Sequence, residues 1–525
     1  MPIYTLELQG HDGAGVVTFY AASDAFNTGP NDAPAHQHFH PSLETPANFE
    51  RALFSAGATA GEASIGFGEI VLANAHGRYD AWPEISFDGR PCIVKTIPTD
   101  PHTGVPLWSY KDAPVLIRGT VENVDLTDAF TKVQLRLYDR LADLDRPLQV
   151  ARYGGTTMAG GQGADGTPDL KDTPKPRIYG RKVNAVPVDV NPFDLIRQVS
   201  DRSCTSIVVY DGGLALTNAG NFSNVAALKA ATVAPGQYAT VLGLGLFRLG
   251  GTPASIVTAD VVAAGGASAA EIARQMLLDA GFASSEIDTP SFDALRAKNG
   301  AACGLSLGGD ESVLSAITRV LRSVGGWIVP NGLGVFSVGR LELPSGSPIA
   351  AFQEWQCRGR VERLAPSDSN RGIPAYRVVV RYGQLGRVQG DNEVAGAVSA
   401  ERRAALALEW RQAAAENGAV KGQYLQAQEM TFDTCLVSAT DAAAEAQRLL
   451  AIYSVRRNIW RIAVDMVGVD YRADPGAGEP FAMEIGLGRT VSLSVSRFLD
   501  PARPFVVVGR VEDCVNNRIQ FDLWG

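Results

Sequence analysis

Short runs of alternating apolar and polar residues fill the first third of the chain. In residues 132–138, Val133, Leu135 and Leu137 alternate with more polar side chains, which is the period of a half-buried strand. Comparable runs bounded by Gly, Pro, Asn or Asp begin near residues 3, 15, 68, 91 and 114. The pattern predicts a β-barrel or sandwich that is interrupted by a long, irregular connection over residues 24–60.

A helical period appears in the middle of the chain, after a short helix or turn and a strand pair over 191–217. Ser268 and Glu271 have the spacing of a capping box, and Gly281 can end that helix. Residues 289–300 predict a second short helix. A third helix has Asp310 as its expected N-cap and an apolar face. That face consists of Val313, Leu314, Ile317, Val320, Leu321 and Val324. A hairpin around Asn331-Gly332 completes an α+β module.

The last third mixes both periods. Residues 376–381 alternate as a strand, and residues 400–417 and 439–457 predict two helices, the second capped by Thr440 or Asp441. The buried side of the second helix is predicted to be Ala446, Leu449, Leu450 and Tyr453. Strands are expected again from residue 458 to the C-terminus.

These patterns predict a multidomain, β-rich α+β protein with two β-barrel-like modules that flank an α+β module. The first domain, with long loops, is expected over residues 1–172, followed by a basic, proline-rich strap over 173–190. The central α+β module is expected over 191–345 and the second β-barrel-like domain, with two helices, over 346–525. The absence of a short-period repeat argues against a solenoid or propeller.

Composition narrows the function classes. The 525 residues are 46% hydrophobic and 20% charged, which is enough apolar material for several cores. The net charge of −9 disfavours duplex binding as the main role but suits a channel wall past which DNA slides. Without a basic leader or an apolar run of about 18 residues, neither secretion nor stable membrane insertion is expected.

Candidates for metal chemistry are few. The cysteines form no C-x-x-C pair, which is typical of buried thiols in a reducing cytoplasm; they are Cys92, Cys204, Cys303, Cys357, Cys435 and Cys514. His36, His38 and His40 alternate in sequence, so an extended chain projects them to one side, where they could begin a metal site. A polar loop or edge strand is the alternative interpretation, because Asp32 and Glu44 are the nearest carboxylates. We expect no cofactor.

Catalytic motifs are also weak. The stretch LGLGLFRLGG resembles a dinucleotide fingerprint, but Arg248 takes the place of the third glycine. Asp80, Glu84 and Asp88 could form a carboxylate pair for glycoside cleavage, yet they are interpreted as turn residues between strands. The chain has no P-loop, nucleophile elbow or zinc-protease motif. The sequence therefore predicts a protein that is not an enzyme.

A basic segment stands out in this acidic chain. Lys175, Arg177, Arg181 and Lys182 lie within eight residues and alternate with prolines and a glycine. Proline fixes φ and restrains the preceding residue, so an extended connector between two domains is expected. Contact with an anionic partner or with a neighbouring subunit stays open as an alternative, and these four residues are the interface candidates.

Several segments resemble the baseplate hub and tail tip proteins of long-tailed bacteriophages and related gene-transfer particles. The resemblance runs through residues 68–95, 119–156 and 175–188, and again through 441–464 and 506–525. It implies a homotrimer in which two β-barrel domains per subunit form a ring of pseudo-sixfold symmetry. Such a ring would match the hexameric tail above it to trimeric parts below it.

The resemblance also implies a place and a set of partners. The chain would be made in the host cytoplasm and built into the virion of a siphophage-like particle, at the tail tip. There it would contact a distal tail ring or tail tube protein, the tape measure protein, and tail fibre or other tip proteins, with DNA only passing through the channel during ejection. A hexameric distal tail ring protein, a tail-associated cell-wall hydrolase and an unrelated cytoplasmic enzyme or carbohydrate-binding protein stay open as alternatives.

Overall fold

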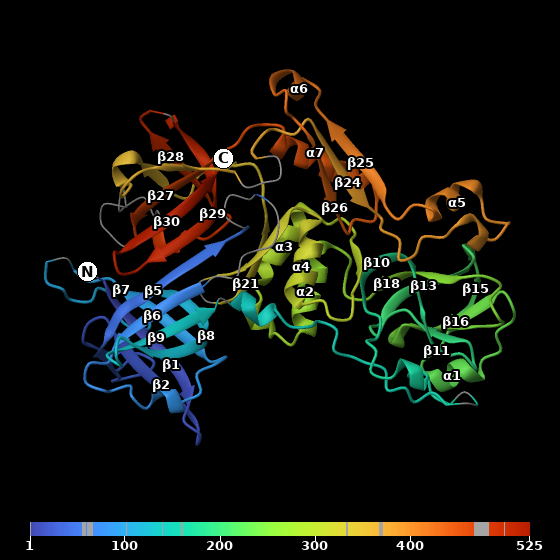
Figure 1. Ribbon diagram of the computed structural model, residues 1–525, viewed down its shortest axis with the longest axis horizontal. Coiled ribbons are helices and arrows are strands. Elements are labelled where there is room, and N and C mark those ends of the chain that lie inside the picture. The colour runs from blue at the N-terminus through green and yellow to red at the C-terminus, as the bar shows by residue number, and fades with distance from the viewer. Residues whose placement is uncertain are drawn as a thin grey trace.

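The computed structural model in Figure 1 is built from several β-sheets around a helical centre. It describes residues 2–54, 59, 67–100, 102–138, 140–158, 160, 162–331, 334–366, 371–466, 482–497 and 499–525. Two β bodies, blue and red in Figure 1, lie against each other at one end, and a third β body, green, lies at the other end. The helices α2, α3 and α4 lie between them. The predicted β-rich α+β organisation is confirmed.

The N-terminal β body contains the strands that the alternating pattern predicted. Val133, Leu135 and Leu137 are fully buried, as expected for the inner face of a strand. The strands are β1 (Ile3–His11), β2 (Val16–Ala22), β3 (Phe26–Asn27), β4 (His38–Pro41), β5 (Leu43–Ala52), β6 (Phe67–Ala73), β7 (Pro91–Ile97), β8 (Val115–Thr127) and β9 (Lys132–Tyr138). The predicted irregular connection over 24–60 is wrong, because it contains β3, β4 and the ten-residue strand β5.

The C-terminal β body packs a second core. Buried apolar residues such as Ile462, Leu493 and Phe521 come from alternate positions of its strands. The strands are β22 (Ala351–Gln353), β23 (Glu362–Leu364), β27 (Ile459–Asp465), β28 (Thr490–Val495), β29 (Leu499–Asp513) and β30 (Arg518–Trp524). The strand pattern predicted after residue 458 is therefore confirmed, while residues 467–481 of that pattern lie outside the described part of the chain.

The two β bodies share one continuous sheet. Strand β29 pairs antiparallel with β5, with Arg510 opposite Arg51 and Val511 opposite Glu50. The amide of Leu53 donates to the carbonyl of Val508 at 2.8 Å. The resulting sheet runs from β23 to β3 without closing into a barrel among the described strands. We call this β5–β29 pairing the seam.

The distal β body, green in Figure 1, contains two five-stranded sheets. One sheet has the order β14-β13-β18-β10-β19 and the other β11-β12-β17-β16-β15. The strands are β10 (Ile178–Ala185), β11 (Val188–Asn191), β12 (Ile196–Gln198), β13 (Cys204–Asp211), β14 (Leu214–Ala215), β15 (Thr217–Asn221), β16 (Gln237–Val241), β17 (Leu246–Leu249), β18 (Val257–Ala263) and β19 (Gly304–Ser306), with the helix α1 (Val225–Ala230). Much of the expected strap over 173–190 is thus strand β10, paired on both edges.

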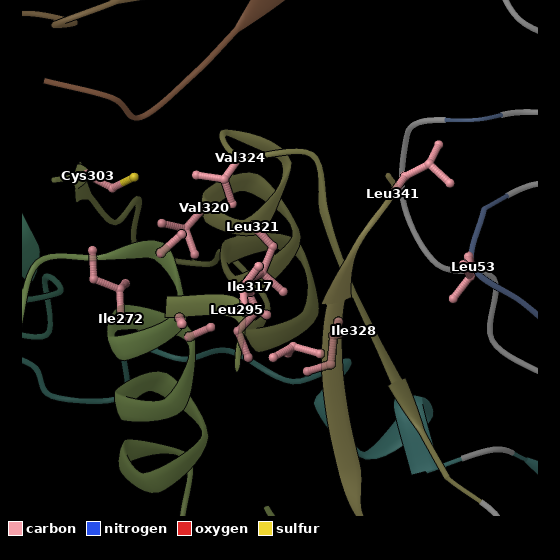
Figure 2. Packing of buried hydrophobic residues seen from close by; sticks show 14 of the residues in the cluster. Leu53, Ile272, Leu295, Cys303, Ile317, Val320, Leu321, Val324, Ile328 and Leu341 are labelled. Atoms are coloured by element: carbon pink, nitrogen blue, oxygen red, sulfur yellow. The ribbon is translucent and has the colours of Figure 1, made fainter. Parts of the chain in front are cut away.

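The central body holds the predicted helices. The helices α2 (Ala269–Asp279), α3 (Thr289–Lys298) and α4 (Val313–Arg322) pack with the hairpin of β20 (Gly326–Pro330) and β21 (Phe336–Arg340). Ser268 and Glu271 form the expected capping box. The cap of α4 is Ser312 rather than Asp310, because the Ser312 hydroxyl accepts from the amide of Ser315. Figure 2 shows Ile317, Val320 and Leu321 of α4 within the buried cluster, and Gly332 of the predicted hairpin turn lies outside the described residues.

The predicted helix over 400–417 is wrong in its second half. Residues 400–406 form α5 (Ala400–Leu406), but residues 411–416 form the strand β25 (Arg411–Glu416). This strand pairs antiparallel with β24 (Arg377–Tyr382), which also pairs with β26 (Glu429–Asp433). Pairing over six residues overrides the helix preference of three consecutive alanines. A short helix, α6 (Ala419–Gln423), follows.

The helix α7 (Ala439–Tyr453) belongs to the central core. Its cap is Ser438 rather than Thr440 or Asp441, and the predicted buried residues Ala446, Leu449, Leu450 and Tyr453 are buried. It lies against β24 and β25 (Figure 1) and shares one apolar cluster with α2, α3 and α4. The predicted division into four domains stays a prediction; the described contacts unite 269–341 with 375–453 in one core.

Candidate functional site

The seam carries a buried charged cluster. Arg51 and Arg510 lie opposite each other across the two strands, and Glu512 is 1% exposed. The guanidinium of Arg510 lies 2.6 Å from the Glu512 carboxylate as an ion pair without hydrogen-bond alignment. It also donates to the carbonyl oxygens of Ile485 and Met483 at 2.9 and 2.8 Å. Burial lowers the pKa of Arg510, against the opposing charge of Glu512. The Glu512 carboxylate therefore offsets the charge of Arg510 next to Arg51.

A cavity of about 910 Å³ opens beside the seam, where the N-terminal, central and C-terminal bodies meet. Its volume is in the range of pockets that bury a drug-sized ligand. The wall mixes apolar side chains with five cations and two carboxylates: Arg51, Lys298, Arg340, Arg489, Arg510, Asp288 and Glu484. We call it the junction cavity.

Trp327 joins two of the bodies in the wall of this cavity. It lies opposite Gly339 in the β20–β21 hairpin, and a Cβ built on Gly339 would overlap its ring. A Cβ built on Gly488 of the C-terminal body would also overlap the ring, and Gly488 has φ +76°, a conformation that favours glycine. The indole therefore fills a slot that two glycines leave open, and it fixes the hairpin against the C-terminal body.

A second charged cluster lies behind the cavity. Glu445 of α7 accepts from Arg340 at 3.0 Å and from Arg448 at 2.6 Å. Arg448 also donates to the carbonyl oxygen of Leu341 at 2.8 Å. Burial lowers the pKa of Arg340, and the charge of neighbouring Arg448 adds to that effect. Glu445 thus holds α7 against β21 and shapes the cavity wall from behind.

The turn between β8 and β9 is strained and exposed. Asp128, Ala129 and Phe130 have φ values of 50°, 53° and 68°, which costs non-glycine residues about 1–2 kcal/mol each. Buried Asn74 stabilises the turn: its side chain donates to the carbonyl of Phe130 at 2.9 Å, and its amide donates to that of Thr131 at 2.6 Å. Strain of this kind is concentrated at functional sites. The turn displays Phe130 with 67% of its surface exposed.

Three of the four predicted interface residues have partners within the chain. Lys175 pairs with Asp165 at 2.6 Å, and Arg177 pairs with Asp201 at 2.5 Å. Burial works against the charge of Arg177, but the hydrogen bonds and charge of Asp201 outweigh it and raise its pKa. Lys182 is 4% exposed, donates to the carbonyl of Gln384 at 3.0 Å, and has a pKa lowered by burial. Arg181 alone of the four is exposed.

Lys182 belongs to a contact between the distal body and an arm over residues 384–410. The amide of Gly386 donates to Val183, and Asn184 donates to the carbonyl of Arg387 at 2.6 Å. Val183 also packs against the small apolar cluster of the arm, which consists of Leu385, Val394, Val398 and Leu406. The basic segment therefore contacts two parts of one chain through β10 and the arm.

The histidines do not converge on a metal site. His38 and His40 lie with ring centroids 6.5 Å apart, and His38 meets the Asn27 side chain at 2.8 Å. His36 has φ +52° in the preceding loop. Burial lowers the pKa of His40, followed by the charge of Arg78. Within the described ranges, no group of three or more His, Cys, Asp or Glu side chains could hold a metal ion.

Two of the other residues considered in the sequence, Asp80 and Arg248, make hydrogen bonds within the fold. Asp80 accepts from the Asn74 side chain at 2.8 Å, in the turn that precedes β7. Arg248 donates to the carbonyl oxygens of Leu228, Lys229 and Ala231 and so caps the end of α1. This explains why arginine replaces glycine in the fingerprint-like stretch. None of the helices in the described ranges combines the length and hydropathy of a membrane-spanning helix.

Comparison with known proteins gives matches only among solved structures. No family model and no curated protein matches the chain. A tail protein from Neisseria meningitidis is 9% identical, with 99% of this chain and 96% of that chain covered and a TM-score of 0.43. A prophage tail protein from Shewanella oneidensis is 10% identical, covering 100% and 96%, with a TM-score of 0.39. A chain in the virion of a native gene transfer agent particle is 16% identical, covering 67% and 84%, with a TM-score of 0.40. The chain is thus similar in fold to a tail protein, to a prophage tail protein and to a chain of a gene transfer agent particle.

Proposed function

We propose that this chain is a structural hub of a bacteriophage-type tail tip, whose copies form a ring that closes the tail tube. The observation that carries the proposal is the seam. Because β5 and β29 belong to one sheet, each copy presents two β bodies in a fixed relation. Three copies would then supply six β bodies of the kind joined by the seam, which is the number that a sixfold tail requires; the distal body of each copy is not counted among them. The segment resemblance to baseplate hubs points to the same assembly.

The proposed mechanism is symmetry matching and gating, without bond making. A closed ring is built from repeated subunit contacts, and its stability comes from the buried interface. The seam, the Arg510–Glu512 pair and the cluster of Glu445 with Arg340 and Arg448 hold the bodies of each copy in a fixed relation. With rigid copies, the same rotation is repeated from one copy to the next until the ring closes. A net charge of −9 per copy suits a channel wall that repels DNA instead of binding it.

The proposed partners follow from this position. A distal tail ring or tail tube protein would lie on the sixfold side, and tail fibre or other tip proteins would lie on the threefold side. The tape measure protein would end in the channel before ejection. Immunogold labelling of intact particles tests the proposal: label at the tail tip supports it, and label on the head or only on free protein contradicts it.

Replacing Arg181 with glutamate tests the basic segment as an interface. Because Arg181 is exposed, the free energy of unfolding should change by no more than about 0.5 kcal/mol. If this face contacts a neighbour, the variant should nevertheless yield few complete tails. Thermal unfolding and particle counts by electron microscopy measure the two effects.

Arg177→Glu is the matched comparison. It places a carboxylate against buried Asp201 and should cost about 3–5 kcal/mol of stability, so its particles are lost through misfolding. Normal infectious particles from Arg181→Glu would contradict the interface role.

A further inference from the structure

We propose that the β8–β9 turn of one copy docks into the junction cavity of a second copy of this chain, with Phe130 as the anchor. The inference rests on the proposed function, because it names the surfaces by which the copies in the ring meet. It joins two features that folding alone does not explain: a strained turn that exposes an aromatic side chain, and a large open cavity with unpaired donors in its wall.

Some buried polar groups in the cavity wall have no hydrogen-bond partner among the described residues. Trp327 Nε1, Arg510 Nε and Thr96 Oγ1 are buried there without a hydrogen-bond partner in the described part of the chain. The first two can only donate. Buried donors are normally paired, so unpaired ones in a cavity indicate a missing acceptor. Carboxylates and backbone carbonyls, both present in an acidic turn, provide such acceptors.

The charges at the rim fit the same occupant. Lys298 and Arg489 line the cavity, are exposed, and have no carboxylate partner in the described ranges. The turn and its flanks carry Asp125 and Asp128, and Lys132 pairs both with Asp128 and with Glu44 of β5. Its net negative charge faces a wall with more cations than carboxylates. The chain as a whole is acidic, so an acidic turn would be repelled by most of the surface of another copy. The basic wall of the junction cavity is therefore a selective docking site for it.

The β8–β9 turn has a fixed backbone conformation before it enters the junction cavity. Asn74 holds Phe130 in one backbone conformation, so little freedom is lost when the side chain enters a pocket. Rigid aromatic side chains that enter pockets are typical anchors of protein interfaces. The apolar part of the wall includes Leu116, Val329 and Leu487, which can pack against the ring.

The two surfaces lie at opposite ends of one strand. Pro114 and Val115, at the start of β8, line the cavity, and the turn follows the end of β8 at Thr127. Thirteen residues of strand separate them by about 40 Å. A copy cannot fill its own cavity across that distance, whereas a head-to-tail contact between copies can. Repeated head-to-tail contacts generate a ring when the rotation closes.

Photo-crosslinking from position 130 tests the inference on the full-length purified chain. With p-benzoylphenylalanine in place of Phe130, we expect crosslinks between copies to peptides over 288–298, 326–330 or 482–489. An intact oligomer whose crosslinks from position 130 map elsewhere would overturn the docking site and leave the proposed ring standing. A chain that stays monomeric at every concentration would overturn both.

Point variants supply the energetic test. Phe130→Asn keeps a residue type that tolerates positive φ, so the turn should fold. Ala294→Trp, on the exposed side of α3, should fill the cavity without disturbing the core. Each should weaken self-association at least tenfold by analytical ultracentrifugation, with the melting temperature unchanged. Phe193→Asn, which removes another exposed aromatic side chain, should leave association unchanged; equal association of all three variants would overturn the inference.

Discussion

Replacing Glu512 with glutamine lowers the free energy of unfolding by about 3–5 kcal/mol, because it removes the buried carboxylate that pairs with the largely buried guanidinium of Arg510 at the seam. Glutamine keeps the size of the side chain, so the loss reports charge and not packing. Each β body retains its own apolar core, so the loss of stability should be largest at the seam. Hydrogen exchange should show β5 and β29 losing protection before β1 and β7.

Glu362→Gln is the control for this prediction. Glu362 lies in the same continuous sheet, on the edge strand β23, and is exposed. Its replacement should change stability by no more than about 0.5 kcal/mol. Chemical denaturation of the two variants in parallel measures the difference. Equal stability of Glu512→Gln and the native chain would mean that the seam is not held by this cluster.

Replacing Gly304 with alanine costs about 3 kcal/mol or more, because the backbones of β10 and β19 approach too closely for a side chain. Gly304 lies opposite Gly180, and a Cβ built on Gly304 would overlap the carbonyl oxygen of Arg181. The neighbouring amide of Arg181 donates to Cys303 at 2.9 Å, so the strands cannot separate without losing hydrogen bonds. Because β19 lies between α3 and α4 in the chain and the neighbours of Gly304, Cys303 and Leu305, pack in the central cluster, the distal body should then come loose from the central body.

Gly308→Ala is matched to that substitution. Gly308 lies four residues further along, and no atom lies within 4 Å of a Cβ built on it. The substitution should leave the melting temperature unchanged, or raise it slightly because alanine lowers the conformational entropy of the unfolded chain. Limited proteolysis between the distal and central bodies should accelerate only in Gly304→Ala. Slow cleavage in both variants would show that the β10–β19 pairing is dispensable.

Local signals predicted the local structure. The capping box of Ser268 and Glu271 and the apolar face of α4 depend on residues within one or two turns, and both are confirmed. The errors arise where distant segments decide. Residues 411–416 have the composition of a helix, but they extend because β24 offers a pairing partner. Strand β5 was not predicted; it lies between β6, which is close in sequence, and β29, which is more than 450 residues away.

The seam and the junction cavity were harder to predict, because both are formed by segments that are distant in sequence. Arg510 and Glu512 stand at alternate positions within an apolar strand, a pattern that can indicate inward-facing charges. Nothing near them in sequence points to Arg51 as the residue opposite. The junction cavity is built from three bodies, so no single segment carries its signature. The basic segment shows the opposite case. Its charges cluster in sequence, but in the structure most of them pair with separate residues of the same chain.

The central claim is that copies of this chain assemble into a ring through their own surfaces. Native mass spectrometry of the purified full-length protein tests it most directly. The account predicts assemblies of three copies, with the six seam-joined β bodies around a channel in electron micrographs of the same sample. Six copies would favour a distal tail ring protein instead. A stable single copy, above all one that consumes a substrate, would contradict the account.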